Sequence, residues 1–245
     1  KALEAVGIDD TIRKHAIPMY CRIMHDEQGQ LTKLPYGKDE QAIWSVSRAG
    51  INEQLIDLAE QEKSVNIHFG HRLSQLNFED NTAVYLTDDH HQRVHKSDLV
   101  FGADGAFSKV RRLMQELPKE RISYSLEYMP QSYMELTIAA NDDGSHKLEK
   151  NALHIWPRKD FMLIALPNVD GSFTCTLFMN HQGEVSFESL QNSQEVREFF
   201  QTHFPDAMDL LESPVEDYLS KAPSPLCLVH IYPWLVNDSV ALIGD

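Results

Sequence analysis

The sequence has few cysteines and few basic residues. Its three cysteines, Cys21, Cys175 and Cys227, are an odd number spread far apart, so they indicate neither a disulfide framework nor a metal site. We therefore expect reduced thiols and a cytoplasmic location. Lys and Arg number 22 against 37 Asp and Glu, which gives a formal net charge of −15. Because binding to nucleic acid needs a basic surface, this balance argues against a nucleic-acid partner.

Long apolar segments are also absent. No run approaches the roughly 20 apolar residues that would span a bilayer, and no signal peptide opens the chain. We therefore expect no membrane contact from this segment. The sequence starts at Lys1 rather than at Met and ends at Asp245, directly after the strand-like VALIG. These ends suggest an interior piece of a longer protein, whose terminal signals and membrane anchors would lie outside it, and the oligomeric state is not indicated.

Several common enzyme motifs are missing as well. The sequence contains no G-x-S-x-G, no H-E-x-x-H and no G-x-G-x-x-G, which argues against the hydrolases and the dinucleotide fold that carry them. His90, His91 and His95 could be considered as metal ligands, but they lie around a predicted hairpin tip that offers no closed site. We expect them to be solvated and expect no metal. A module that only binds a ligand stays an alternative to an enzyme.

A strand, a turn and a helix are predicted over residues 98–112. Residues 99–101 form a short apolar run typical of the last strand of a buried sheet. Gly102, Asp104 and Gly105 favour a tight turn, and Ser108 is a suitable N-cap for the helix that follows. Ligands of open α/β sheets collect at the carboxyl ends of strands, so we expect this turn to bind a ligand.

A hairpin is predicted near the start of the chain. Residues 19–25 and 31–36 are strand-like and flank a turn containing Gly29. Antiparallel pairing would bring Arg22 close to Tyr36. The alternative is a surface arginine and an edge tyrosine without a shared role.

The remaining patterns predict a mixed α/β (α+β) fold. An antiparallel sheet is expected after Pro118, because four strand-like runs are joined by polar turns. In the run FMLIAL, residues 162, 164 and 166 share one face and residues 161, 163 and 165 share the other; either face could be core and the other could line a pocket. The helix at 49–62 has an apolar stripe expected to be core. The other predicted elements are short helices within 3–16, strands at 42–46, 65–69, 73–78 and 82–87, sheet strands at 133–139, 152–156, 161–166 and 173–179, helices at 193–203 and 206–211, and strands at 226–232 and 240–243.

Two motifs resemble those of the flavin-dependent aromatic hydroxylases. DGAFSKVR at residues 104–111 resembles their D-G-x-x-S-x-x-R motif, and VALIGD at residues 240–245 resembles their second motif. The two lie about 140 residues apart, with a β-rich region between them, as in that family. The resemblance implies part of a FAD-binding Rossmann-like domain in residues 1–118, an antiparallel β-sheet substrate domain in residues 119–233 and a return strand in residues 234–245.

The similarity extends along the chain to the branch of this family that hydroxylates L-kynurenine. Segments that carry it are IPMYCR, LPYG, SVSRAGIN, YMELTI, LHIWPR, FMLIALPN and FTCTLFM. It implies that Arg22 and Tyr36 bind the substrate carboxylate. Trp156 and His154 are expected to be structural. The apolar wall around the substrate ring is implied to be Leu153, Met162, Ile164, Leu166 and Phe178; the implied cofactor contacts are Arg48, Leu73, Asp104, Gly105, Arg111, Gly244 and Asp245.

The reaction implied by this resemblance uses FAD, with NADPH as cosubstrate. NADPH would reduce FAD, O2 would add at flavin C4a, and the hydroperoxide would deliver one oxygen to L-kynurenine to give 3-hydroxykynurenine. No side chain is expected to act as a catalytic acid or base. The alternatives are a related hydroxylase of another aromatic acid and a non-catalytic flavin-binding domain. Because the G-x-G-x-x-G unit and the region after the second motif are absent, the isolated fragment is expected to be inactive.

Overall fold

The computed structural model describes residues 2–38 and 41–244, and the chain divides into two compact units. Unit 1 comprises Lys1–Glu62 and Pro130–Leu226, and unit 2 comprises Lys63–Met129 and Cys227–Asp245. Strands β9 (Ser123–Ile138) and β13 (Ser224–Tyr232) each continue from one unit into the other. The functional division predicted at residues 118 and 233 stays a prediction, and the compact units divide the chain at other positions.

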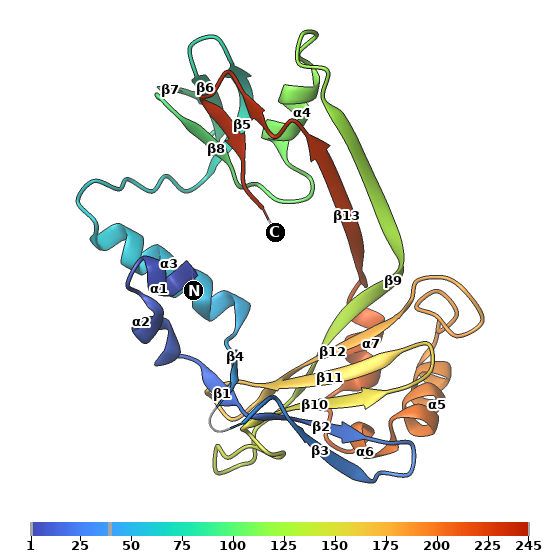
Figure 1. Ribbon diagram of the computed structural model, residues 1–245. Coiled ribbons are helices and arrows are strands. Elements are labelled where there is room, and N and C mark those ends of the chain that lie inside the picture. The colour runs from blue at the N-terminus through green and yellow to red at the C-terminus, as the bar shows by residue number, and fades with distance from the viewer. Residues whose placement is uncertain (1, 39–40, 245) are drawn as a thin grey trace. The chain divides into compact units, whose positions relative to one another are not determined.

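The main feature of unit 1 is a seven-stranded sheet with the order β13-β9-β12-β11-β10-β2-β3 (Figure 1). Neighbouring strands from β9 to β10 are antiparallel, as predicted, and β2 pairs with β3 as the predicted hairpin. The parallel pairing of β2 with β10 joins the hairpin to the rest of the sheet. The other strands are β2 (Cys21–His25), β3 (Leu31–Pro35), β10 (Ala152–Pro157), β11 (Met162–Pro167) and β12 (Phe173–Asn180).

One face of this sheet is the core of unit 1. Leu163 and Ala165 of β11 are fully buried there, which decides between the two faces left open by the alternation of FMLIAL. Burying a side chain such as Leu163 contributes about 1.5–3 kcal/mol. Residues of the helices pack on the same face, including Val196 and Phe200. These helices are α5 (Ser193–His203), α6 (Pro205–Met208) and α7 (Pro214–Ser220), of which α7 was not predicted.

The N-terminal part of unit 1 holds shorter elements. Strand β1 (Ile17–Met19) pairs with β4 (Ile43–Ser45), and helices α1 (Ala2–Ala5) and α2 (Asp9–Arg13) precede them. Helix α3 (Arg48–Gln61) begins where Ser47 accepts a hydrogen bond from the Gly50 N–H at 2.9 Å. The prediction that its apolar stripe is core is wrong, since none of its residues is buried. Helical periodicity shows which face could be buried, but burial also requires another element to cover it.

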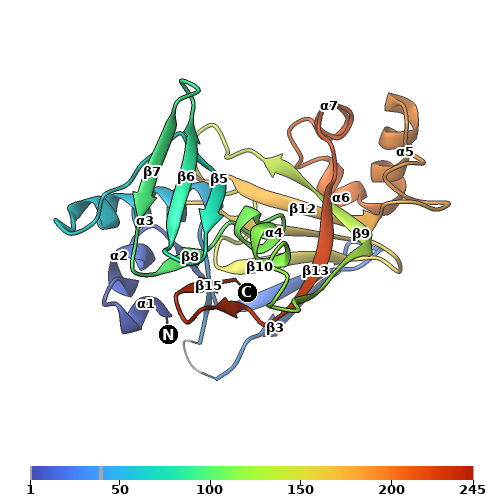
Figure 2. The same cartoon turned by 90° about the horizontal axis from the view of Figure 1, so that it is seen from above.

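Unit 2 contains two three-stranded sheets and one helix (Figure 2). The first sheet has the order β5-β6-β7, and the second has the order β14-β15-β8, with β15 and β8 parallel. Helix α4 (Lys109–Gln115) buries Val110 and Met114 against residues of both sheets. The strands are β5 (His71–Asn77), β6 (Thr82–Thr87), β7 (Gln92–Lys96), β8 (Val100–Gly102), β14 (Leu235–Val236) and β15 (Val240–Leu242).

Two predictions about unit 2 are wrong. Residues 65–69 form no strand, because an apolar run becomes a strand only where another strand pairs with it. The run at 99–101 is not buried as expected: Leu99 and Phe101 are 56% and 59% exposed. Strand β8 lies at the edge of its small sheet, which explains this exposure.

All three cysteines have free thiols, in agreement with the prediction. Burial raises the pKa of Cys175 to about 12. Among the helices that the structure describes, none combines the length and the apolar character needed to cross a membrane.

Candidate functional site

The sheet face of unit 1 that points away from the core carries most of the predicted substrate residues. We define this open face by the alternate residues of four neighbouring strands that are not fully buried. Six of the seven predicted substrate residues belong to it, and Tyr36 directly follows β3 at its edge. The open face consists of Arg22, Met24, Leu153, Ile155, Pro157, Met162, Ile164, Leu166, Thr174, Thr176, Phe178 and Asn180.

The strand register arranges these residues in rows across the sheet. Arg22 on β2 lies beside Leu153 on β10, and the same register places Leu166 on β11 next in that row. In another row, Met162 on β11 lies opposite Phe178 on β12. Side chains opposite one another on neighbouring strands are in contact range. The register therefore brings together a cation and an apolar surface that come from distant parts of the sequence.

Arg22 and Tyr36 are neighbours, as the predicted hairpin requires. The Arg22 guanidinium carbon lies 5.4 Å from the centre of the Tyr36 ring. The Tyr36 hydroxyl oxygen is buried and has no hydrogen-bond partner within residues 2–38 and 41–244. Burial raises the pKa of Tyr36, although the charge of Arg22 partly opposes this. A buried hydroxyl without a partner is unfavourable unless a ligand supplies one.

Two histidines lie on the core face of the same strands. His25 Nε2 is 2.9 Å from His154 Nδ1, and His25 Nδ1 is 3.1 Å from the Asp206 carboxylate. The Trp156 indole N–H donates to the same carboxylate at 2.7 Å. Both histidines are at least 97% buried, and burial lowers the pKa of His154 to about 4. Because these groups point away from the open face and bond to one another, they hold strands β2 and β10 on helix α6.

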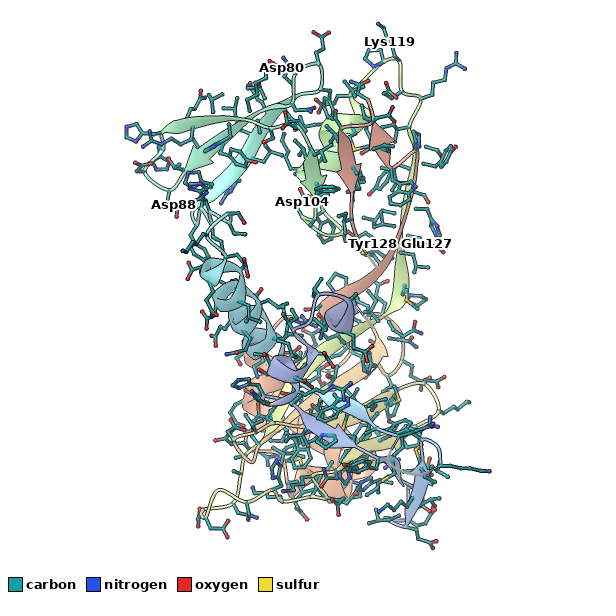
Figure 3. The ribbon with its side chains drawn as sticks, turned by 60° about the vertical axis from the view of Figure 1, so that its left-hand side comes forward. Asp80, Asp88, Asp104, Lys119, Glu127 and Tyr128 are labelled. Atoms are coloured by element: carbon teal, nitrogen blue, oxygen red, sulfur yellow. The ribbon has the colours of Figure 1, made fainter. Side chains whose placement is uncertain are left out.

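In unit 2, Asp104 lies in the turn between β8 and α4 (Figure 3). Its carboxylate accepts hydrogen bonds from the backbone N–H groups of Lys109 at 2.6 Å and Val110 at 3.2 Å. Burial opposes ionisation of Asp104, but hydrogen bonds from Ser108, Val110 and Lys109 outweigh it and lower the pKa. Gly105 has φ +75°, a conformation that favours glycine. The sequence D-G thus forms a helix-capping turn with a negative charge.

The two predicted cofactor motifs meet at the ends of parallel strands. Gly102 ends β8 and pairs with Leu242 at the end of β15, and the Ile243 N–H donates to the Gly102 carbonyl at 3.0 Å. A Cβ atom on Gly102 would lie only 2.8 Å from a Val110 carbon, so this close packing requires glycine. The chain after β15, with Gly244, consequently lies beside the turn after β8.

A cavity of about 960 Å³ opens at this place within unit 2. Three of the predicted cofactor residues line it, namely Gly105, Arg111 and Gly244. Strand β9 contributes residues 123–125, and residues 227–232 of β13 line it too. This volume is typical of a site for a small molecule or cofactor.

Arg111 is the buried charge of this cavity. It is 5% exposed, one of its terminal nitrogens donates to the Ala106 carbonyl at 2.6 Å, and its guanidinium carbon lies 4.5 Å from the centre of the Tyr124 ring. Its Nε atom is buried and has no hydrogen-bond partner in the described part of the chain. No sequence motif singled out Tyr124, because its contact with Arg111 depends on how strand β9 lies against helix α4.

The other predicted residues lie elsewhere. Arg48 belongs to unit 1, at the start of α3, where a hydrogen bond with Tyr133 raises its pKa. Leu73 packs against the hydrophobic core of unit 2 and is not among the residues that line the cavity. Asp245 lies outside the described residues.

No group of metal ligands occurs within residues 2–38 and 41–244. The histidines at positions 90, 91 and 95, which the sequence placed around a hairpin tip, are all exposed. This agrees with the expectation that they are solvated.

Comparisons with known proteins identify the family. A family model described as an FAD binding domain matches residues 1–203. The whole chain is 42% identical over 246 residues to kynurenine 3-monooxygenase of Flavobacterium johnsoniae and 39% identical over 247 residues to kynurenine 3-monooxygenase of Sus scrofa. It covers 54% and 51% of these two proteins, so the chain spans about half the length of the curated relatives it matches.

Solved structures show the same fold at low sequence identity. The pqsL protein of Pseudomonas aeruginosa, a probable FAD-dependent monooxygenase, matches with a TM-score of 0.70 and 14% identity, over 99% of this chain and 65% of that one. The tetrameric form of 2-methyl-3-hydroxypyridine-5-carboxylic acid oxygenase matches with a TM-score of 0.68 and 15% identity, over 99% of this chain and 61% of that one. Together with the family match, these findings show that the chain belongs to the FAD binding domain family.

Proposed function

We propose that the whole protein is an FAD-dependent, NADPH-consuming monooxygenase that converts L-kynurenine to 3-hydroxykynurenine. The observation that carries this proposal is the open face, where Arg22 lies beside an apolar wall and next to the free hydroxyl of Tyr36. An aromatic amino acid presents the matching chemistry, with a carboxylate at one end and an apolar ring at the other. The names of the relatives agree with this substrate.

The residues around the cavity of unit 2 fit a flavin nucleotide. Gly105 and Gly244 leave the backbone accessible, since a Cβ atom at either position would contact nothing within 4 Å. Arg111 offers a buried N–H without a partner, which suits an anionic or carbonyl group. We propose that Arg48, Leu73, Asp104 and Asp245 also serve the cofactor, as the family resemblance implies. When bound, FAD supplies the redox chemistry that activates O2.

The chain's own residues orient the substrate and exclude water. Arg22 can bind the amino-acid carboxylate through two parallel hydrogen bonds, and the Tyr36 hydroxyl can donate a third. Leu153, Met162, Ile164, Leu166 and Phe178 would hold the ring in a fixed position and keep water away from the reacting carbon. The ring amino group already activates that carbon, so no side chain has to act as a general base.

The test uses the full-length protein. Purified with its flavin, it should oxidise NADPH faster when L-kynurenine is added and should form 3-hydroxykynurenine, which chromatography with mass detection identifies. Flavin-loaded protein that forms no such product would contradict the substrate assignment. A cytoplasmic location also stays a prediction, which rests on the three free thiols.

Two alternatives are separated by the same assay. If other aromatic acids stimulate NADPH oxidation and L-kynurenine does not, the protein is a related hydroxylase with another substrate. If the full-length protein has no flavin absorbance band after purification and does not acquire one with added FAD, the cofactor assignment fails.

A further inference from the structure

Two threonines of β12, Thr174 and Thr176, lie on the open face beside the apolar wall. Thr176 on β12 lies opposite Ile164 on β11, and its neighbour two residues along the same face is Phe178. Both of these apolar residues belong to the predicted wall around the substrate ring. Thr176 therefore lies within that wall and adds a hydroxyl to it.

The hydroxyl of Thr176 is free to bind a ligand. It takes part in no hydrogen bond with any described residue. The nearest comparable hydroxyl, that of Thr174, accepts a hydrogen bond from the Asn168 side chain at 3.0 Å. Glu135 of β9 lies opposite Thr176, but its side chain is exposed and interacts with the charge of Arg48. Among these side chains, Thr176 thus combines a position in the wall with an unused hydroxyl.

Thr176 and Arg22 lie at a separation that suits the two ends of an aromatic amino acid. Strands β2, β10, β11 and β12 are successive neighbours in the sheet (Figure 1). Thr176 is three strands away from Arg22, about 14 Å at about 4.8 Å per strand. It also lies two residues, about 7 Å, along β12 from Thr174, the residue at which the row of Arg22 reaches that strand. A long arginine side chain and a substrate carboxylate would occupy one part of this span, and the aromatic ring would occupy the rest.

We infer that the Thr176 hydroxyl accepts a hydrogen bond from the ring amino group of the substrate and thereby makes the site specific for an ortho-amino aromatic ketone. This inference rests on the proposed function. In L-kynurenine, one N–H of the ring amino group bonds internally to the neighbouring ketone oxygen, and the other N–H has no internal partner. Against a wholly apolar wall that second N–H would lose its hydrogen bond to water without compensation.

The experiment compares two ligands on the full-length, flavin-loaded protein. L-Kynurenine and its analogue without the ring amino group, 2-amino-4-oxo-4-phenylbutanoate, are titrated, and dissociation constants are taken from the change in flavin absorbance. Thr176→Val keeps the shape of the side chain and removes the hydroxyl. We expect it to weaken L-kynurenine binding about tenfold, the usual effect of leaving one polar group unpaired, and to leave the analogue's affinity within about twofold. Thr176→Ser should retain the preference.

Thr137→Val is the matched control. Thr137 lies on β9, on the same face of the sheet, opposite Thr174 of β12. It is therefore not paired with a residue of the predicted wall. The Thr137→Val variant should bind both ligands with the affinity of the wild type. If Thr176→Val weakened the binding of both ligands equally, or changed neither dissociation constant, the inference would be overturned. Failure of the proposed function looks different, because the wild-type protein would then neither bind L-kynurenine nor hydroxylate it.

Discussion

At the scale of single residues, Arg22 and Tyr36 show how a motif and a fold combine. The hairpin was predicted from two strand-like runs, and a diagonal pairing across it places the guanidinium 5.4 Å from the phenol ring. Neither group is held by another described side chain through an ion pair or hydrogen bond. Both are thus available to a ligand, which supports their proposed role.

Arg22→Ala should raise the dissociation constant and KM for L-kynurenine at least tenfold, since a hydrogen bond to a charged group contributes about 1.5–3 kcal/mol. Arg22→Lys should recover only part of the loss, because an ammonium cannot bind a carboxylate through two parallel hydrogen bonds. Steady-state kinetics of the full-length variants measure this. An unchanged KM in Arg22→Ala would remove Arg22 from the carboxylate site.

Asp104 has a structural role whatever its contact with the cofactor. Its carboxylate accepts two backbone N–H groups at the start of α4. Asp104→Ala should lower the free energy of unfolding by about 1 kcal/mol, the usual cost of losing such an acceptor. Asp104→Asn keeps an acceptor oxygen, so its free energy of unfolding should fall by less. Chemical denaturation of both variants tests this, and equal loss in the two would argue against the capping role.

At the scale of elements, local patterns predicted the strands well but not all of their surroundings. The alternation in FMLIAL located two faces, yet only the helices packed on Leu163 and Ala165 decide which one is core. The stripe on α3 predicted burial that does not occur, since covering a face depends on elements remote in sequence. Tyr124 was missed for the same reason, because its contact with Arg111 joins helix α4 to strand β9, which lines the cavity.

The histidine pair on β2 and β10 should make the stability of unit 1 depend on pH. Burial lowers the pKa of His154 from 6.5 to about 4, and the charge of His25 also disfavours its protonation, whereas Glu149 opposes the shift. The unfolded chain therefore binds a proton before the folded chain does. Stability should fall as pH decreases from about 6.5 to about 4, by up to about 3 kcal/mol from this group.

Denaturant titrations of the wild type and of His154→Gln between pH 4 and pH 7 measure this effect. The variant should be less stable at pH 7, because a hydrogen bond between β10 and β2 is lost, but its stability should change less with pH. His25 has a lowered pKa too, so some dependence will remain. Parallel curves for the two proteins would contradict the assignment to His154.

At the scale of the whole molecule, the two proposed sites draw on different parts of the chain. The substrate residues lie in unit 1, and the cavity lies wholly within unit 2, each with its own hydrophobic core. The cofactor motifs could be recognised in the sequence, since each is contiguous. That they meet depends on the parallel pairing of β8 and β15, two strands separated by the whole substrate region.

Because the substrate residues and the cavity belong to different units, each with its own hydrophobic core, we expect a substitution in one unit to leave the fold of the other unchanged. A Cβ atom on Gly244 would contact nothing within 4 Å, so Gly244→Val should fold with an unchanged melting temperature while its side chain occupies space at the cavity wall. In the full-length protein it should lower the flavin content, measured by absorbance after purification. Arg22→Ala should leave the flavin content unchanged and weaken only the binding of the substrate. Because changes at independent sites are additive, the double variant should combine both defects; a flavin loss in Arg22→Ala as large as in Gly244→Val would show that the sites are coupled.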